Sequence, residues 1–151
     1  MAEKVAVIVG SRNDLEFIEG AKELLVKFGI EHEVHAMSAH RSLDKTMEFA
    51  ETAEENGFEV IIACAGMAAH LPGVIAAKTI LPVIGVPLPT SDIRGMDSLL
   101  AIVQMPSGVP VATMAIGKAG VKNAAILAAE ILARKNPAVR ERLKAYKESL
   151  K

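Results

Sequence analysis

The sequence predicts an α/β fold of three layers, α/β/α, in which helices cover both faces of a five-stranded parallel β-sheet. Two observations lead to this prediction. Short apolar runs rich in Val and Ile alternate along the chain with longer segments of helical periodicity. Several of these runs are apolar at every position, which is typical of strands buried on both faces of a parallel sheet.

The first strand and the first helix are expected near the amino end. Residues 5–9 (VAVIV) contain no polar position and therefore predict a buried strand. Residues 13–28 predict a helix, because Asn13 followed by Glu16 resembles a capping box. Gly29, directly after this segment, is a typical helix stop.

The next elements repeat the pattern with one difference. Residues 30–37 alternate polar and apolar side chains, so they predict a strand nearer an edge of the sheet. Ser42 is expected to cap a helix that ends near residues 56–57. Residues 58–64 predict a third strand, which is apolar at every position except Glu59.

The remaining elements complete the alternation. They are a helix over residues 71–79, a strand over 83–86, a helix over 96–105, a strand over 109–115, an Ala-rich helix over 117–133 and a charged C-terminal helix from residue 137. Right-handed crossovers between five strands favour the flavodoxin-like order 2-1-3-4-5. Because no linker or internal repeat is recognisable, residues 1–151 are expected to form one domain.

The composition narrows the class of function. With 17 basic and 18 acidic residues, the chain lacks the clustered Lys and Arg that nucleic acid or an anionic membrane surface requires, so neither is an expected partner. Hydrophobic residues make up 51% of the chain, a surplus that favours a homo-oligomer with one side of the Ala-rich helix at a subunit contact. The single cysteine and the lack of a recognisable signal peptide or membrane span favour a cytoplasmic protein.

Three polar segments follow the first three predicted strands. They are residues 10–14 (GSRND), 38–42 (SAHRS) and 66–73 (GMAAHLPG). The carboxyl ends of parallel strands meet at one edge of a sheet, and neighbouring strands lie about 4.8 Å apart, so one small ligand can contact all three segments. The sequence therefore predicts a reaction site that combines two histidines, an arginine, serines and a carboxylate.

Each polar residue of these segments also has a purely structural explanation. Ser11 and Asp14 suit either an anion site at a helix start or simple capping. Arg41 suits either a phosphate clamp or a surface salt bridge. His40 is the strongest candidate for proton transfer, because an imidazole exchanges protons near neutral pH, but a lone loop histidine can also be structural. His70 can belong to the site or serve only as a cap or packing residue of the helix that follows it.

The signatures of common cofactors are missing. Ala112 and Ala119 occupy positions where a P-loop needs Gly and Ser or Thr, and no dinucleotide fingerprint follows the first strand. His32 and His35 point to opposite faces of a strand and so do not form a metal site. We expect no cofactor and no metal, and we expect Cys64 to pack in the core rather than to act as a nucleophile.

At these residues the chain resembles the PurE family of purine biosynthesis. The resemblance runs from residue 5 to about residue 133 and is carried by motifs at residues 10–14 (GSxxD), 38–41 (SAHR), 68–73 (AAHLPG), 97–99 (DSL), 102–106 (IVQMP) and 115–120 (AIGKAG). It implies an isomerase, a mutase that moves a carboxyl group from the exocyclic nitrogen to ring carbon four of aminoimidazole ribonucleotide without metal, ATP or biotin. It also implies a homo-octamer with sites at subunit boundaries.

The resemblance assigns roles to the polar residues. Ser11 and Arg41 are expected to hold the phosphate of the ribonucleotide substrate, with Ser38 nearby. Asp14 is expected to accept hydrogen bonds from the ribose hydroxyls. His40 is expected to protonate the departing nitrogen and later to remove the proton from ring carbon four.

The mechanism that the resemblance implies requires a tight pocket that retains the freed carbon dioxide. The expected walls and remaining substrate contacts are Ala39, Gly66, Met67, Ala68, Ala69 and Leu71. His70 is expected to orient the substrate or to seal this pocket. The family commonly has glycine where Met67 stands, so this chain departs from the pattern at that wall.

Two other functions stay open. A sibling branch of the family carboxylates aminoimidazole ribonucleotide directly with carbon dioxide, but its loop differs, and the intact AHLPG at residues 69–73 favours the mutase. A non-catalytic flavodoxin-like binding module would have no need of His40.

Overall fold

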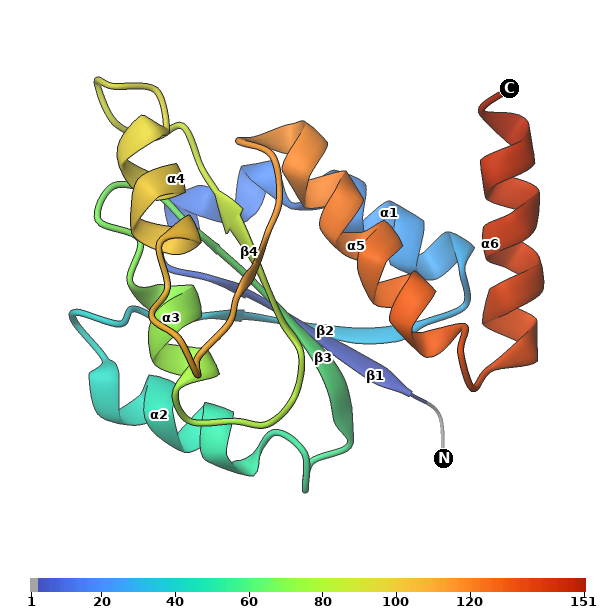
Figure 1. The fold of residues 1–151 in the computed structure, drawn as a ribbon, viewed down its shortest axis with the longest axis horizontal. Helices are drawn as coiled ribbons and strands as arrows, with labels where there is room; N and C mark the ends of the chain where they lie inside the picture. Colours follow the sequence, from blue (N-terminus) through green and yellow to red (C-terminus); the bar gives the residue numbers. More distant parts are fainter. Residues whose placement is uncertain (1–2) are drawn as a thin grey trace.

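The computed structural model describes residues 3–151 and contains a parallel sheet between two layers of helices (Figure 1). Its five strands are β1 (Lys4–Val9), β2 (Glu31–Ala36), β3 (Phe58–Ala65), β4 (Val83–Pro87) and β5 (Ala112–Thr113). Their order is β2-β1-β3-β4-β5, and every neighbouring pair is parallel. The predicted fold class and strand order are confirmed.

The helices divide between the two faces of the sheet. They are η1 (Arg12–Phe17), α1 (Glu19–Lys27), α2 (Leu43–Thr52), α3 (Leu71–Ala76), α4 (Met96–Val103), α5 (Lys118–Leu132) and α6 (Pro137–Ser149). Helices α1 and α5 cover one face, α2, α3 and α4 cover the other, and α6 lies outside α5 at the edge of the molecule (Figure 1). Within the described residues, no helix combines the length and apolar character needed to cross a membrane.

The alternation of side chains along β1 separates two cores. Val5, Val7 and Val9 pack into a core shared with α1 and α5, whereas Ala6 and Ile8 face a second core shared with α2 and α3. All of these residues are fully buried. The uniformly apolar sequence of β1 therefore follows from its position in the middle of the sheet, with a helical layer on each side.

The first helix differs from its prediction. Residues 13–28 do not form one helix: a 3-10 segment, η1, is followed by α1, and the two meet at Ile18. The expected capping box is wrong, because Ser11 is the N-cap and its Oγ accepts a hydrogen bond from the Asn13 backbone at 3.3 Å. A tighter 3-10 turn is common at a helix start, and Asp14 is buried in this one.

The last strand is shorter than predicted. Only Ala112–Thr113 pairs as a strand, whereas residues 109–115 were expected to do so. Pro110 has no backbone N–H to donate to a sheet ladder, which keeps the preceding residues outside it. Contact with β4 continues beyond β5 through hydrogen bonds from Met114 N to Gly85 O at 2.9 Å and from Gly117 N to Pro87 O at 2.8 Å.

Candidate active site

A cavity of about 830 Å³ opens at the carboxyl edge of the sheet. It is lined by the loops that follow β1, β2, β3 and β4. The structure places all of the predicted site residues on its walls, namely Ser11, Asp14, Ser38, Ala39, His40, Arg41, Gly66, Met67, Ala68, Ala69, His70 and Leu71. Because β1 lies between β2 and β3, the loops that follow these three strands are neighbours.

The loop after β1 contributes a buried carboxylate. Asp14 is only 7% exposed, and burial raises the pKa of its carboxyl above the ordinary value. A hydrogen bond to the Ser11 backbone and the positive charge of Arg41 act in the opposite direction, while the charge of Glu16 adds to the rise. Asp14 is therefore an acceptor held in a partly desolvated place beside a cation.

The loop after β2 is organised around the side chain of Ser38. Its Oγ accepts hydrogen bonds from the backbone N–H groups of His40 at 3.2 Å and Arg41 at 3.1 Å. Ser42 occupies the N-cap position of α2 without the expected capping bond, since its Oγ accepts from Ser38 N and donates to Ser38 O. The loop is thereby closed on itself and leaves the side chains of His40 and Arg41 exposed to the cavity.

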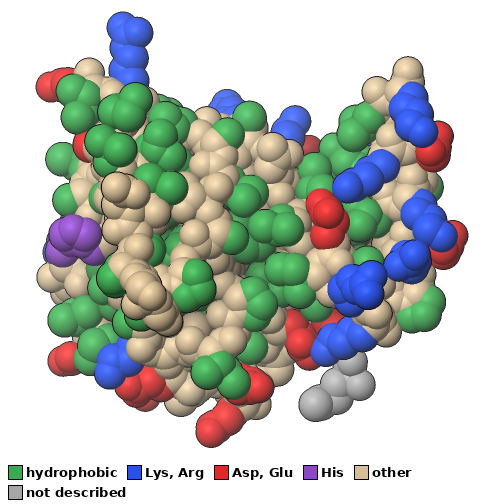
Figure 2. Space-filling model, in the orientation of Figure 1, with side chains coloured by type: hydrophobic (Ala, Val, Ile, Leu, Met, Phe, Trp, Pro, Cys, Tyr) green, Lys and Arg blue, Asp and Glu red, His purple; other side chains and the backbone are tan. Residues whose placement is uncertain are grey.

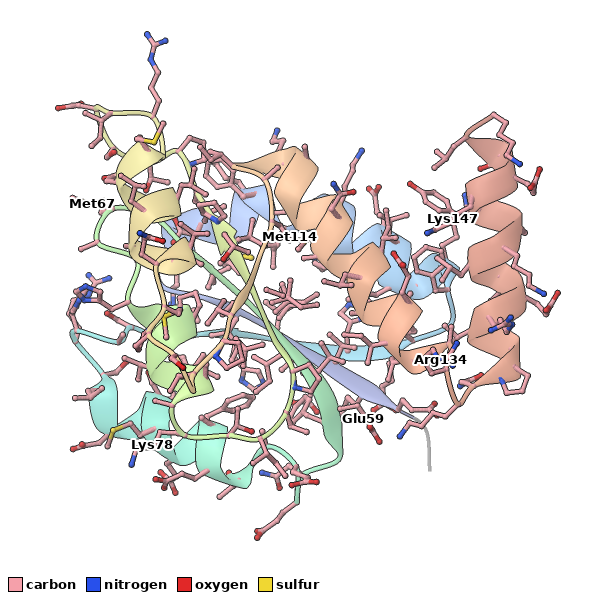
Figure 3. All side chains as sticks on the ribbon, viewed as in Figure 1. Glu59, Met67, Lys78, Met114, Arg134 and Lys147 are labelled. Carbon is pink, nitrogen blue, oxygen red and sulfur yellow. The ribbon has the colours of Figure 1, made fainter. Side chains whose placement is uncertain are left out.

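The loop after β3 turns sharply at its start. Ala69 N donates to Gly66 O at 3.1 Å, and Met67 between them has a left-handed φ of 53°. Met67 lies at the outer edge of the molecule in Figure 3 and is 61% exposed. His70 then takes the N-cap position of α3 without a capping bond from its side chain.

The two histidines of the site are in direct contact. His40 Nε2 lies 2.6 Å from His70 Nδ1, and the two rings meet at 74° with their centroids 4.8 Å apart. A hydrogen bond between two imidazoles needs a hydrogen on one of the facing nitrogens and a lone pair on the other. The pair therefore holds one hydrogen between the loops after β2 and β3.

Sequence reasoning missed the contribution of β4. Pro89 and Thr90 line the cavity beside the predicted residues, as do Asn13, Glu16 and Phe17 from the loop after β1 and η1. Pro89 and Thr90 directly follow a strand that the sequence did predict. The rule that placed the first three loops at one edge of the sheet applies equally to this fourth loop.

The structure also bears on a nucleophilic cysteine and on a metal site. Cys64 is fully buried in the core, as predicted, and burial together with the charge of Asp14 raises the pKa of its thiol to about 12. Among residues 3–151, no three His, Cys, Asp or Glu side chains are grouped so that they could hold a metal ion.

The chain is similar to known proteins over nearly its whole length. A protein of Thermotoga maritima named N5-carboxyaminoimidazole ribonucleotide mutase is 55% identical over 98% of this chain and 85% of its own length. A protein of Saccharolobus solfataricus with the same name is 54% identical over 98% of this chain and 92% of its own length. The crystal structure of Treponema denticola PurE superposes with a TM-score of 0.86 at 28% identity, covering 97% of this chain and 90% of that one.

The sequence profile of the AIR carboxylase family matches residues 4–151. This match spans every strand and helix from β1 to α6. The predicted resemblance to PurE is therefore confirmed, and the chain belongs to the AIR carboxylase family.

Proposed function

We propose that this chain is an N5-carboxyaminoimidazole ribonucleotide mutase, which converts that carbamate into 4-carboxy-5-aminoimidazole ribonucleotide. The name of its relatives supports the proposal. The single observation that carries it in the structure is the pair of His40 and His70, in contact over a cavity that also contains Arg41 and Asp14. These groups suit proton transfer on a phosphorylated, hydroxyl-bearing substrate.

The substrate would bind with its phosphate and ribose toward β1 and β2. Arg41 supplies a permanent positive charge for the phosphate, and Ser11 and Ser38 supply hydroxyl groups close to it. Asp14 would accept hydrogen bonds from the ribose diol, a role that suits a buried carboxylate. The aminoimidazole ring of the substrate would then extend toward His40 and the loop after β3.

His40 would move a single proton between two positions of the substrate. As the bond between the exocyclic nitrogen and the carboxyl carbon breaks, its electron pair stays on nitrogen, which takes the proton from His40. Carbon dioxide is released inside the cavity, ring carbon four bonds to it, and the hydrogen of that carbon returns to His40 as a proton. Atoms and electrons balance without a co-reactant. His70, in contact with His40, would fix the direction in which the shared hydrogen points.

Retention of carbon dioxide is the other requirement of this reaction. The wall next to the histidines consists of Met67, Ala68, Ala69 and Leu71, which offer no nucleophilic or charged side chain to the gas. Holding the two reactants together replaces a bimolecular recapture by an intramolecular step. We therefore assign the confinement of carbon dioxide to the loop after β3.

We also propose a cytoplasmic homo-octamer with sites at subunit boundaries. Figure 2 shows apolar side chains gathered over α4. The α4 stripe consists of Met96, Leu100 and Val103, which share one face of α4 by their spacing, and of Ile93 in the turn before the helix; each is at least 45% exposed. A contiguous exposed apolar patch of this kind marks an interaction surface, and the cytoplasm is where a phosphorylated nucleotide precursor is retained.

An isomerisation assay tests the proposed reaction. Purified protein is supplied with the carbamate alone, and the carboxylated ring product is followed after correction for decay in buffer. A mutase forms this product without added carbon dioxide. A protein that forms it only from aminoimidazole ribonucleotide and carbon dioxide is the direct carboxylase instead, and the proposal is then wrong.

The variant His40→Asn tests the role of the proton shuttle. An amide can hydrogen-bond but cannot transfer a proton at neutral pH, so we expect kcat to fall at least ~100-fold with substrate binding retained. His35→Asn is a matched control, because His35 contacts Glu33 on β2 and does not line the cavity. Unchanged turnover in His40→Asn would show that His40 is not the proton shuttle, whereas a non-catalytic binding module would show no turnover even in the wild type.

A further inference from the structure

We propose that Thr90 is a substrate-positioning residue, whose hydroxyl donates a hydrogen bond to the carboxyl group in transit. This inference rests on the mutase function proposed above and adds a group from the loop after β4, which sequence reasoning did not place in the site. Thr90 lines the cavity next to the loop that carries Met67 and His70.

The position of Thr90 is constrained by the two residues before it, Leu88 and Pro89. Leu88, two residues earlier, donates its N–H to Ala65 O at 2.9 Å, and its carbonyl accepts from Ser98 Oγ at 3.0 Å. Leu88 is fully buried, and Pro89 between it and Thr90 has a restricted φ. A side chain on so constrained a backbone is well placed to hold a ligand in one geometry.

The hydroxyl of Thr90 lies directly against the backbone of Gly66. A Cβ added to Gly66 would overlap Thr90 Oγ1 and come within 3.1 Å of Thr90 Cβ. Gly66 therefore lets the hydroxyl approach the start of the loop that carries His70. The contact joins the fourth strand to the reacting end of the proposed substrate position.

Three hydroxyl side chains line the cavity, and Thr90 differs from the other two. Ser11 Oγ accepts from Asn13 N, and Ser38 Oγ accepts from two backbone N–H groups. Within residues 3–151, no hydrogen bond engages the hydroxyl of Thr90. Its donor and its lone pairs are thus available to a ligand, while Ser11 and Ser38 also shape their own loops.

The chemistry of the proposed step favours a neutral donor at this point. A carboxylate that must leave its nitrogen as carbon dioxide becomes harder to release when a cation binds it strongly. A neutral hydroxyl contributes a weaker bond than a charged donor does. It can hold the carboxylate before release and orient it after recapture without trapping either state.

The experiment compares Thr90→Val, which removes the hydroxyl at nearly constant shape, with Thr90→Ser, which keeps it. We expect Thr90→Val to lower kcat for the carbamate about tenfold, with KM changed less than about threefold. A larger share of turnovers should end as free aminoimidazole ribonucleotide. Thr90→Ser should restore both kcat and the low share of released intermediate.

Thr52→Val is the control, because Thr52 lies on α2 and donates its hydroxyl to Glu48 O outside the cavity. Should Thr90→Val fail to fold, Thr90→Ala takes its place. The inference would be overturned if Thr90→Val had wild-type kinetics and released no more free aminoimidazole ribonucleotide than the wild type. It would also be overturned if Thr90→Ser were as impaired as Thr90→Val. A wild-type protein that does not convert the carbamate at all would instead overturn the proposed function.

Discussion

Asp14 is a carboxylate that the fold buries although burial disfavours its charge. Because the pKa of its carboxyl group is raised in the folded protein, folded Asp14 binds a proton more tightly than Asp14 in the unfolded chain does. Stability from this group is fully present below the ordinary aspartate pKa, near pH 4, and is lost as the pH rises through the folded value. At pH values above the folded pKa, the burial of Asp14 therefore costs stability.

Replacement of Asp14 by Asn should consequently stabilise the ligand-free protein at pH 7. The gain should shrink as the pH falls through the ordinary aspartate range, because Asp14 is then protonated in the wild type as well. Thermal unfolding of both proteins at pH 7 and pH 4 measures this difference. Asp92→Asn, at an exposed loop position, is the control. A less stable Asp14→Asn variant at pH 7 would contradict the burial argument.

Met67 holds a backbone conformation that side chains with a Cβ disfavour. Its φ of 53° lies in the left-handed region, where a β-branched residue is strained most. We expect Met67→Gly to be at least as stable as the wild type and Met67→Val to be about 1–2 kcal/mol less stable. Denaturant unfolding measures both, with Ala68→Val as the neighbouring control. Equal stability of the Gly and Val variants would show that the turn is not strained.

The residues of the candidate site could be predicted largely from their places after strands. Ser11, His40 and His70 each follow a segment that the sequence identifies as a strand, so their common edge follows from topology. The contact between His40 and His70 could not be predicted, because it depends on the course of two loops and on side-chain rotamers. Thr90 was missed although it follows a recognised strand, since it carries no charge and no imidazole.

At the scale of elements, α6 is joined to the domain by few but specific contacts. Arg142 donates to Phe28 O at 3.2 Å, where α1 ends, and the ring of Tyr146 meets Phe28 edge-on at 5.4 Å. Val139 and Leu143 are the buried side chains of the helix. These contacts lie on the side of the molecule that carries α1 and α5, away from the cavity lining.

Leu143→Ala should therefore lower the free energy of unfolding by about 2 kcal/mol, because it removes buried apolar contacts and leaves a cavity. Lys144→Ala, one residue along on the exposed face, should change it by less than about 0.5 kcal/mol. Urea unfolding followed by circular dichroism measures both variants. A similar small effect of the two substitutions would show that α6 does not contribute to the cooperative unit.

The first helix and the last strand have different bounds from those that the sequence predicts. Asn13 and Glu16 fit a capping box, but the N-cap is Ser11, two residues after the end of β1. The segment that begins there is a 3-10 helix. The apolar residues 109–111 favour a strand, yet Pro110 removes a donor from the ladder. In both cases the pattern of apolar residues placed the element, and a single residue, Ser11 or Pro110, decided where it begins.

At the scale of the whole molecule, the α4 stripe leads to a test of assembly. Leu100→Glu would place a charge in the middle of this exposed apolar face, so we expect it to reduce the proposed octamer to smaller species. Light scattering after size-exclusion chromatography measures the mass. Val26→Glu is the control, because Val26 is also exposed, at 68%, but lies on α1 away from the stripe. An unchanged mass of Leu100→Glu would place the subunit contact elsewhere.

Cys64, enclosed by the sheet and its helical layer, has one practical consequence. Thiol reagents attack the thiolate, and a fully buried group with a pKa of about 12 offers almost none at neutral pH. Since the chain contains no other cysteine, a new one introduced on its surface would be the single position to accept a maleimide dye. The wild-type background is thus ready for fluorescence labelling without prior removal of its own sulfhydryl.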